Sequence, residues 1–202
     1  MKDAWTQVTP SEFPWEREGL AFLKERLPDH DPFRAWANFE FIVDGTVSEV
    51  DVLVVAKKGI FLVELKGWQG RVSGDAGTWE RTRPNAVHPR LEDNPFILAN
   101  KKAKRLKSLL SRQKALRGKR LPFIAALIFL SDPDLRIQLT EEAQRGVTQR
   151  DDKETDDLPG VVGALTTLTA EEQRRGRPQV DRPMAKLITA AIEQAGIRPS
   201  QR

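Results

Sequence analysis

Residues 49–68 read EVDVLVVAKKGIFLVELKGW, and the rest of the chain is organised around them. Two apolar runs rich in β-branched residues flank a polar break at Lys57-Lys58-Gly59, which is the signal of a β-hairpin. Continuous apolar runs are typical of strands that are covered on both faces of a sheet. The stretch therefore predicts a buried hairpin.

Charged residues stand at the far ends of both runs: Asp51 on the first, and Glu64 and Lys66 on the second. If Lys57-Lys58 is a two-residue loop, Asp51 faces Glu64 and shares a side of the sheet with Lys66. Carboxylates that face each other across two strands repel. The ammonium group of Lys66, or a Mg²⁺ or Mn²⁺ ion held by oxygens, has to offset that repulsion.

These residues resemble a known signature. Asp51 followed by Glu64-Leu65-Lys66 on the next strand is similar to the Asp…Glu-x-Lys pattern of restriction-endonuclease-like nucleases. The wider string, with Gly-Trp-x-Gly after Lys66, looks like the nuclease-related NERD domain over about residues 14–110. The resemblance implies an α/β restriction-endonuclease-like fold, a mixed sheet flanked by helices. A structural, salt-bridged hairpin is the alternative explanation.

The resemblance also implies an activity, the metal-dependent hydrolysis of nucleic acid phosphodiesters. Asp51 and Glu64 would hold Mg²⁺ or Mn²⁺, with the Leu65 carbonyl as a further ligand. The metal would stabilise charge on the phosphate and lower the pKa of a bound water. Lys66 would orient or help to activate that water. The rival hypothesis is a catalytically silent module on the same fold that binds nucleic acid or a protein partner.

The pattern of residues 15–27 predicts a first helix that ends before Pro28, and an additional acidic residue is expected from this helix. Glu16 lies on the leucine-bearing face of that helix. A glutamate in a first turn is also explained by the helix dipole alone. NERD domains carry an active-site acid in this helix, so the resemblance implies that role for Glu16, with Glu18 as the fallback.

A second helix is predicted from Asn94-Pro95 to about residue 116, and no acidic residue occurs between Asp93 and Asp132. This run of basic residues without acidic ones has two equally good explanations: a charged helix face that is only solvated, or a face that contacts phosphates. NERD domains carry Asn-Pro-x-x-Gln here, whereas this chain has Leu98 in place of the glutamine. The residues predicted to bind nucleic acid are Lys101, Lys104, Arg105 and Lys107.

The other elements are predicted from shorter patterns. Residues 34–43 predict a strand whose odd-numbered residues share one face, and residues 121–130 a central strand that is reached by a crossover. Residues 141–157 suggest an exposed or mobile insertion, residues 160–165 a last strand and residues 183–196 a closing helix.

The length of 202 residues predicts one domain, residues 14–196, between a polar lead-in at 1–13 and a polar tail at 197–202. Lys and Arg total 33 against 29 acidic residues, so a polyanionic partner is permitted. There is no cysteine, and His30 and His88 are the only histidines. Thiolate sites and His-rich zinc sites are therefore excluded.

No apolar run approaches the ~20 residues that a membrane span needs, so we expect a cytoplasmic protein that does not bind membranes. Nucleic acid is the expected partner, with DNA favoured over RNA. NERD domains occur fused to helicases and kinases, which implies a partner domain or the proteins of a defence complex. The chain is similar to the amino-terminal part of phage-defence serine/threonine kinases of the phage growth limitation type.

Overall fold

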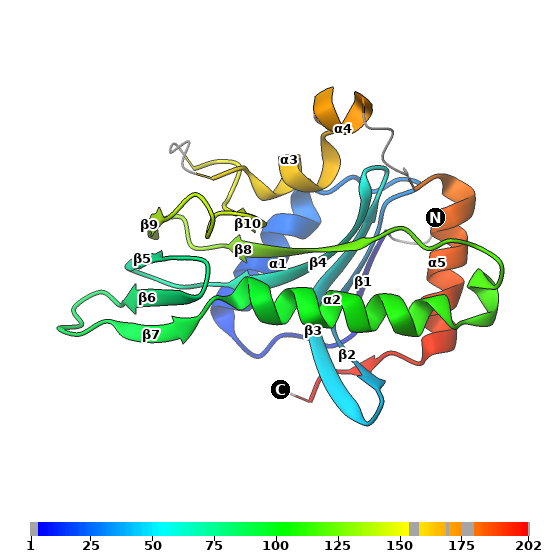
Figure 1. Ribbon diagram of the computed structural model, residues 1–202, viewed down its shortest axis with the longest axis horizontal. Coiled ribbons are helices and arrows are strands. Elements are labelled where there is room, and N and C mark those ends of the chain that lie inside the picture. Colours follow the sequence, from blue (N-terminus) through cyan, green and yellow to red (C-terminus); the bar gives the residue numbers. More distant parts are fainter. Residues whose placement is uncertain (1–3, 154–157, 169, 175–179, 202) are drawn as a thin grey trace.

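The computed structural model describes all residues except 1–3, 154–157, 169, 175–179 and 202. Its centre is a mixed sheet whose strands are, in spatial order, β1 (Trp5–Gln7), β2 (Arg34–Val43), β3 (Thr46–Ala56), β4 (Gly59–Lys66), β8 (Ile124–Leu130) and β10 (Val147–Thr148), and β11 (Arg198–Pro199) also pairs with β2. In this sheet β2, β3 and β4 form an antiparallel meander and β8 lies parallel to β4 (Figure 1).

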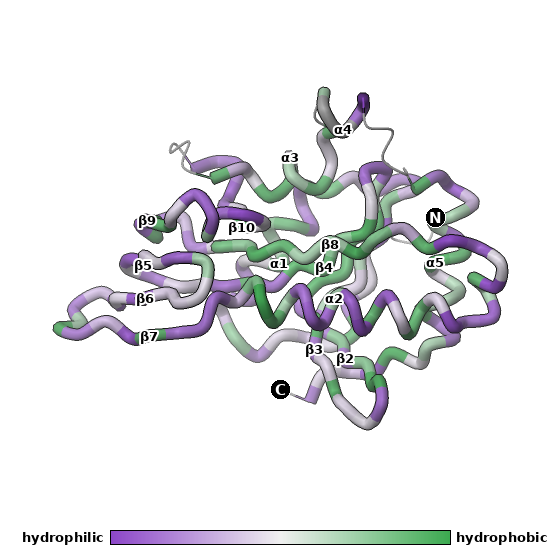
Figure 2. Tube along the Cα trace, in the orientation of Figure 1, coloured by the Kyte–Doolittle hydropathy of each residue, from purple (hydrophilic) through white to green (hydrophobic). Residues whose placement is uncertain are grey.

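Helices cover both faces of this sheet (Figure 1). One face carries α1 (Pro14–Arg26) and α3 (Val161–Thr166), and the other carries α2 (Pro95–Ser111) and α5 (Arg182–Ala195). Figure 2 shows apolar residues along β4 and β8, and polar and apolar residues mixed along α2. Two further helices in the described residues are short, η1 (Lys114–Leu116) and α4 (Ala170–Arg174). The restriction-endonuclease-like architecture expected from the sequence is confirmed.

A smaller four-stranded sheet extends from the ends of β4 and β8, and we call it the satellite sheet (Figure 1). Its strands are, in spatial order, β7 (Arg90–Asp93), β6 (Thr78–Thr82), β5 (Arg71–Gly74) and β9 (Arg136–Leu139). Trp79 of β6 is fully buried and contacts the ring of Trp68 edge to face, with 6.0 Å between ring centroids. This contact anchors the satellite sheet beside the end of β4.

The register of the central hairpin is the predicted one. Val55 pairs with Ile60 and Val52 pairs with Val63, so Lys57-Lys58 is a two-residue loop. The pairing stops at Val52 and Val63, one position before Asp51 and Glu64 would meet. The backbone pairing of the hairpin therefore ends at the predicted site.

The prediction that the odd-numbered residues of β2 share one face is wrong. Asn38 has a φ of +54°, a left-handed conformation that breaks the alternation of side chains. Ala35 and Ala37 accordingly pack in the core on the α1 side, whereas Phe39 and Phe41 pack in the core on the α2 side. The register between β2 and β3 places Asn38 across from Asp51. The sheet is thus distorted at the candidate site.

Other predictions are confirmed or corrected by the same contacts. The central strand and the closing helix are confirmed as β8 and α5. The prediction of a strand at residues 160–165 is wrong, because α3 begins at Val161 and the Asp151 carboxylate accepts hydrogen bonds from the Val162 and Gly163 N–H groups in its first turn at 2.9 and 3.0 Å. A short apolar run does not distinguish the two structures.

The lead-in, the insertion and the tail all contribute strands to the central sheet. The lead-in holds β1 and the tail holds β11, and both pair with β2. The prediction that residues 141–157 are an exposed insertion is wrong for Val147 and Thr148, which form the buried strand β10 and pair with β8. Residues 154–157 lie outside the described residues. None of the helices in the described part of the chain is long and apolar enough to cross a membrane.

Candidate active site

Glu64 lies near the end of β4, and its two carboxylate oxygens bind different lysines. Oε1 accepts a hydrogen bond from Lys66 Nζ at 2.9 Å, and Oε2 accepts one from Lys102 Nζ at 2.8 Å. Burial on its own raises the pKa of the Glu64 carboxyl, but the ammonium groups of Lys66 and Lys102 outweigh it and hold the pKa below its ordinary value. The structure thus keeps a buried, ionised carboxylate between two cations.

Lys102 was not among the site residues predicted from the sequence. It sits among exposed basic residues of α2, yet its side chain is only 10% exposed. A signal was present, because Lys102 follows the buried Ala99 by three positions and precedes the buried Leu106 by four. A lysine at that position lies at the edge of the core-facing stripe of the helix, so its ammonium group needs a buried acidic partner.

Asp51 occupies the gap in which β3 and β4 separate. Its side chain is buried, and Oδ2 accepts a hydrogen bond from the Leu65 N–H at 2.8 Å. The Lys66 carbonyl points the other way, because it accepts a hydrogen bond from the Ser131 N–H. Since the N–H and C=O groups of one strand residue point to the same side, the Leu65 carbonyl faces the gap that holds Asp51.

Glu16 is buried on α1 as predicted, with 2% of its surface exposed, and Ser11 Oγ donates a hydrogen bond to its Oε2. Glu16, Asn38, Glu49 and Asp51 help to line a cavity of about 20 Å³. A space of this size holds about one water molecule. Glu18, the fallback, is a surface residue that pairs with Arg150.

Glu64 does not line that cavity and opens instead into a larger groove, the α2 groove, of about 720 Å³. Glu49 lines both spaces and lies between them. In the described part of the chain no three Asp, Glu, His or Cys side chains are grouped so that they could hold a metal ion. The structure therefore brings Asp51 close to Glu16, and Glu64 close to the two lysines.

The four basic residues predicted on α2 divide into two pairs. Lys101 and Arg105 line the α2 groove beside Glu64. Lys104 is exposed and does not line it, and Lys107 places its ammonium group over the Phe123 ring, 5.6 Å from the centroid. Only the first pair faces the candidate site.

The donor atoms suit Mg²⁺ or Mn²⁺ in kind. The oxygens available are the carboxylates of Asp51 and Glu64 and the carbonyl that Leu65 turns toward the gap. Mg²⁺ is commonly bound by one or two carboxylates together with water and substrate phosphates, so a third acidic ligand is not required. To serve as a ligand, Glu64 would exchange a contact with Lys66 or Lys102 for the metal.

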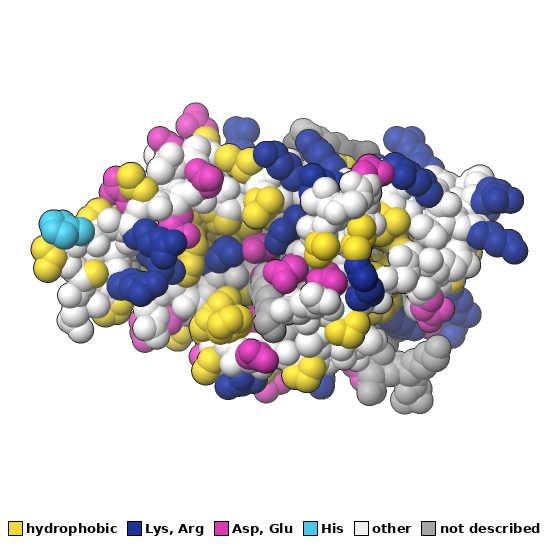
Figure 3. Space-filling model, turned by 90° about the horizontal axis from the view of Figure 1, so that it is seen from below, with side chains coloured by type: hydrophobic (Ala, Val, Ile, Leu, Met, Phe, Trp, Pro, Cys, Tyr) yellow, Lys and Arg dark blue, Asp and Glu magenta, His cyan; other side chains and the backbone are white. Residues whose placement is uncertain are grey.

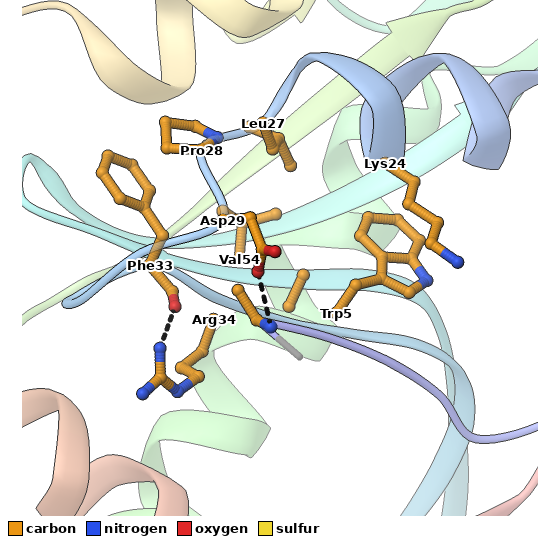
Figure 4. Close-up of a pocket in the computed structure, with 10 residues that line it drawn as sticks. Trp5, Lys24, Leu27, Pro28, Asp29, Phe33, Arg34 and Val54 are labelled. Atoms are coloured by element: carbon orange, nitrogen blue, oxygen red, sulfur yellow. Dashed lines mark hydrogen bonds between the residues drawn. The ribbon is translucent and has the colours of Figure 1, made fainter. Parts of the chain in front are cut away.

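A further cavity, of about 130 Å³, lies on the α1 side of the sheet and is lined by none of these residues (Figure 4). Two of its polar side chains are engaged with the main chain. The Asp29 carboxylate accepts a hydrogen bond from the Ala4 N–H at 3.0 Å, and Arg34 donates to the Phe33 carbonyl. It carries no arrangement suited to hydrolysis.

Comparison with known proteins identifies a family and a curated relative. A family model described as Nuclease-related domain, NERD, matches residues 11–131. The chain is 39% identical over 197 residues to the probable kinase PglW of Streptomyces coelicolor, strain A3(2). That alignment covers 97% of this chain and 12% of the kinase, so the chain spans a small part of its relative. The resemblances to NERD domains and to part of a kinase are confirmed.

Among solved structures, the protein of unknown function AF1548 matches over 90% of this chain and 98% of its own length. The sequences are 11% identical and the TM-score is 0.38.

Proposed function

Because the chain belongs to the nuclease-related domain family, we propose that it hydrolyses phosphodiester bonds in nucleic acid with the help of Mg²⁺ or Mn²⁺. The observation that carries the proposal is the pair of contacts at the end of the central hairpin. Asp51 and the Leu65 main chain share one gap, and Glu64 lies buried next to it between Lys66 and Lys102. Carboxylate oxygens and ammonium groups thus lie near the carboxyl end of β4, in two neighbouring spaces.

Each of these residues has a task in the proposed reaction. Asp51, Glu64 and the Leu65 carbonyl would hold the metal, which supplies charge stabilisation and a bound water of lowered pKa. Lys66 would orient that water, and Lys102 would balance negative charge on the phosphate. Glu16, which is separated from Glu64, would act through the water-sized cavity that it shares with Asp51.

Substrate binding would free an oxygen of Glu64 to act as a metal ligand. Lys66 and Lys102 neutralise its carboxylate in the structure, and a phosphodiester offers these ammonium groups a second anionic partner. When a phosphate draws one lysine away, an oxygen of Glu64 is free for another ligand. The two lysines would therefore couple the entry of substrate to the completion of the site.

The test is a cleavage assay with single- and double-stranded DNA and RNA in Mn²⁺ and in EDTA. The wild type should cleave at least one substrate only with metal, and Glu64→Gln should abolish cleavage while leaving binding intact. Lys66→Ala should lower the single-turnover rate by orders of magnitude. Glu141→Gln, an exposed change away from the site, is the matched control. Metal-independent cleavage, or equal cleavage by Glu64→Gln, would contradict the proposal.

A second candidate function is a silent regulatory or interaction module. It is favoured by the finding that both oxygens of Glu64 are already satisfied by lysines, which makes the site stable without a metal. The relative of which the chain spans a part is named as a kinase, so such a module could serve a phage-defence kinase. Nucleic acid binding without any metal-dependent cleavage would favour this candidate.

A further inference from the structure

Three arginines of the satellite sheet line one groove, which we call the arginine groove. They are Arg71 on β5, Arg83 directly after β6 and Arg136 on β9, and all three are exposed. The groove has a volume of about 590 Å³ and is also lined by Asp132 and Asp134. Neither these acids nor any other described residue forms an ion pair within 4 Å of the three arginines.

The main chain forces two of these arginines together. Arg71 and Arg136 are partners in the parallel register of β5 and β9, and the Arg136 N–H donates to the Gly70 carbonyl at 2.9 Å. Like charges at partner positions of adjacent strands destabilise a sheet. Arg83 follows Thr82, which is the partner of Arg71 on the other side. An anion bound among the three guanidinium groups would remove this repulsion.

An aromatic groove of about 700 Å³ adjoins the arginine groove, because Gln69, Arg83 and Pro84 line both. Its other walls include Trp15, Trp68 and Gly67, the residue directly after Lys66. The two grooves therefore form one path from the satellite sheet to the carboxyl end of β4.

The aromatic groove has a fixed and partly exposed ring at its wall. Trp15 is 38% exposed and stacks on Phe13, with 5.8 Å between ring centroids and 26° between planes. Phe13 is 42% exposed and lines the neighbouring small cavity that also holds Asp51. Trp15 lies so close to Gly67 that an added Cβ there would be 2.7 Å from the tryptophan Cβ. The main chain beside Lys66 thus holds the aromatic pair in place.

We propose that the arginine groove and the aromatic groove together bind a single strand of nucleic acid and lead it to Lys66. Phosphates would contact Arg71, Arg83 and Arg136, and an unpaired base would stack on Trp15 and Phe13. Basic grooves with exposed aromatic rings are the general solution for binding single strands. This inference rests on the proposed function and names its substrate class.

A duplex fits these features less well, because its bases are already stacked on one another and present no free face to an aromatic ring.

Figure 3 shows Lys and Arg side chains gathered near the satellite sheet, with a hydrophobic group between them and the centre of the same face. This track differs from the α2 residues expected to bind nucleic acid. Lys101 and Arg105 lie in the separate α2 groove, beside Glu64.

The test is fluorescence anisotropy in EDTA with a labelled oligothymidylate and with a duplex of the same length. Arg71→Gln with Arg136→Gln should weaken single-strand binding and reduce the slope of log affinity against log salt by about 0.7 per lost contact. Lys119→Gln with Arg120→Gln removes two exposed charges beyond the end of α2 and is the matched control. Because Arg71 and Arg136 repel each other, the arginine variant should melt no lower than the wild type.

The aromatic part is tested by Trp15→Ala and, in case that change disturbs packing on Gly67, by Phe13→Ala. Each should weaken single-strand binding roughly 5-fold or more and leave duplex binding nearly unchanged. Polyglutamate, which has charge but no bases, should compete poorly. Tighter binding of duplex, an arginine variant that binds like the control, or aromatic variants that bind like the wild type would each overturn the proposal.

The assay also separates this inference from the nuclease proposal, because EDTA makes binding independent of cleavage. If the groove variants lose single-strand binding and the wild type never cleaves, the nuclease proposal fails and the binding track stands. If the wild type cleaves and the groove variants bind and cleave normally, the track fails and the nuclease proposal stands.

Discussion

Lys102 Nζ donates a hydrogen bond to Glu64 Oε2 at 2.8 Å, which joins α2 to β4 through a buried ion pair. The two residues are 38 positions apart in the chain, and both side chains are at most 10% exposed. The contact fixes the helix that carries the basic residues against the strand that carries the candidate catalytic residues. The positions of Lys101 and Arg105 relative to Glu64 therefore depend on it.

The first prediction concerns Lys102→Met, which keeps the length of the side chain and removes its charge. Losing one partner of a buried ion pair costs up to about 3–5 kcal/mol, and the cost should be smaller here because Glu64 keeps Lys66. We expect a lower melting temperature and weaker substrate cleavage, measured by thermal melts and single-turnover rates. Lys104→Met, an exposed change on the same helix, is the control, and equal behaviour of the two variants would refute the role of Lys102.

The second prediction concerns pH and Glu64. A carboxyl group whose pKa is lower in the folded state contributes stability above its ordinary pKa of 4.5 and loses it as pH falls through the folded value. The melting temperature of the wild type should therefore fall more steeply than that of Glu64→Gln between about pH 5 and pH 3. The other carboxylates are common to both proteins, so the difference isolates Glu64. Parallel curves would show that the lysines do not stabilise its ionised form.

The central hairpin was predictable because the residues that determine its register are close together in the sequence. A two-residue loop and a side-chain period of two fix the register between Val52 and Val63, and the apolar stripe fixes the buried face of α2. The left-handed conformation of Asn38 was not predictable, since nothing in the surrounding residues requires it. It reverses the alternation of β2 at the position across from Asp51, and Asp51 lines a cavity with Glu16 while Glu64 lines the separate α2 groove.

Two features of the site depend on contacts between distant parts of the chain. Arg71 and Arg136 are neighbours only because β5 and β9 pair in parallel after a long crossover, and no local pattern predicts such a pairing. The pairing of Lys102 with Glu64 likewise required α2 to be docked on β4. Sequence patterns predicted the acidic residues of the candidate site, whereas tertiary packing determined which cations meet them.

The third prediction separates the two halves of the basic face of α2. Lys101→Gln with Arg105→Gln should weaken nucleic acid binding and flatten the salt dependence, because both residues line the α2 groove beside Glu64. Lys104→Gln with Lys107→Gln removes the same charge from the same helix outside that groove and should have a smaller effect. Anisotropy titrations at several salt concentrations measure both slopes. If the pairs behave alike, only the net charge of the helix matters.

The fourth prediction uses Asp51 to test the metal site without any substrate. Asp51→Asn keeps an oxygen that can accept the Leu65 N–H and removes the negative charge, so its melting temperature in EDTA should stay equal to that of the wild type or rise. Asp51→Ala leaves the Leu65 N–H without that acceptor and should cost about 1–3 kcal/mol.

The response to metal distinguishes the role of the Asp51 charge from the role of its hydrogen bond. A ligand that binds only the folded state stabilises it by mass action, so millimolar Mg²⁺ or Mn²⁺ should raise the melting temperature of the wild type. Both Asp51 variants should lack that increase, although only Asp51→Ala is destabilised in EDTA. A wild type indifferent to both metals, together with a strongly destabilised Asp51→Asn, would mean that the carboxylate has a structural role. Asp51 would then have to be withdrawn as a metal ligand, and the nuclease proposal would lose its chemical basis.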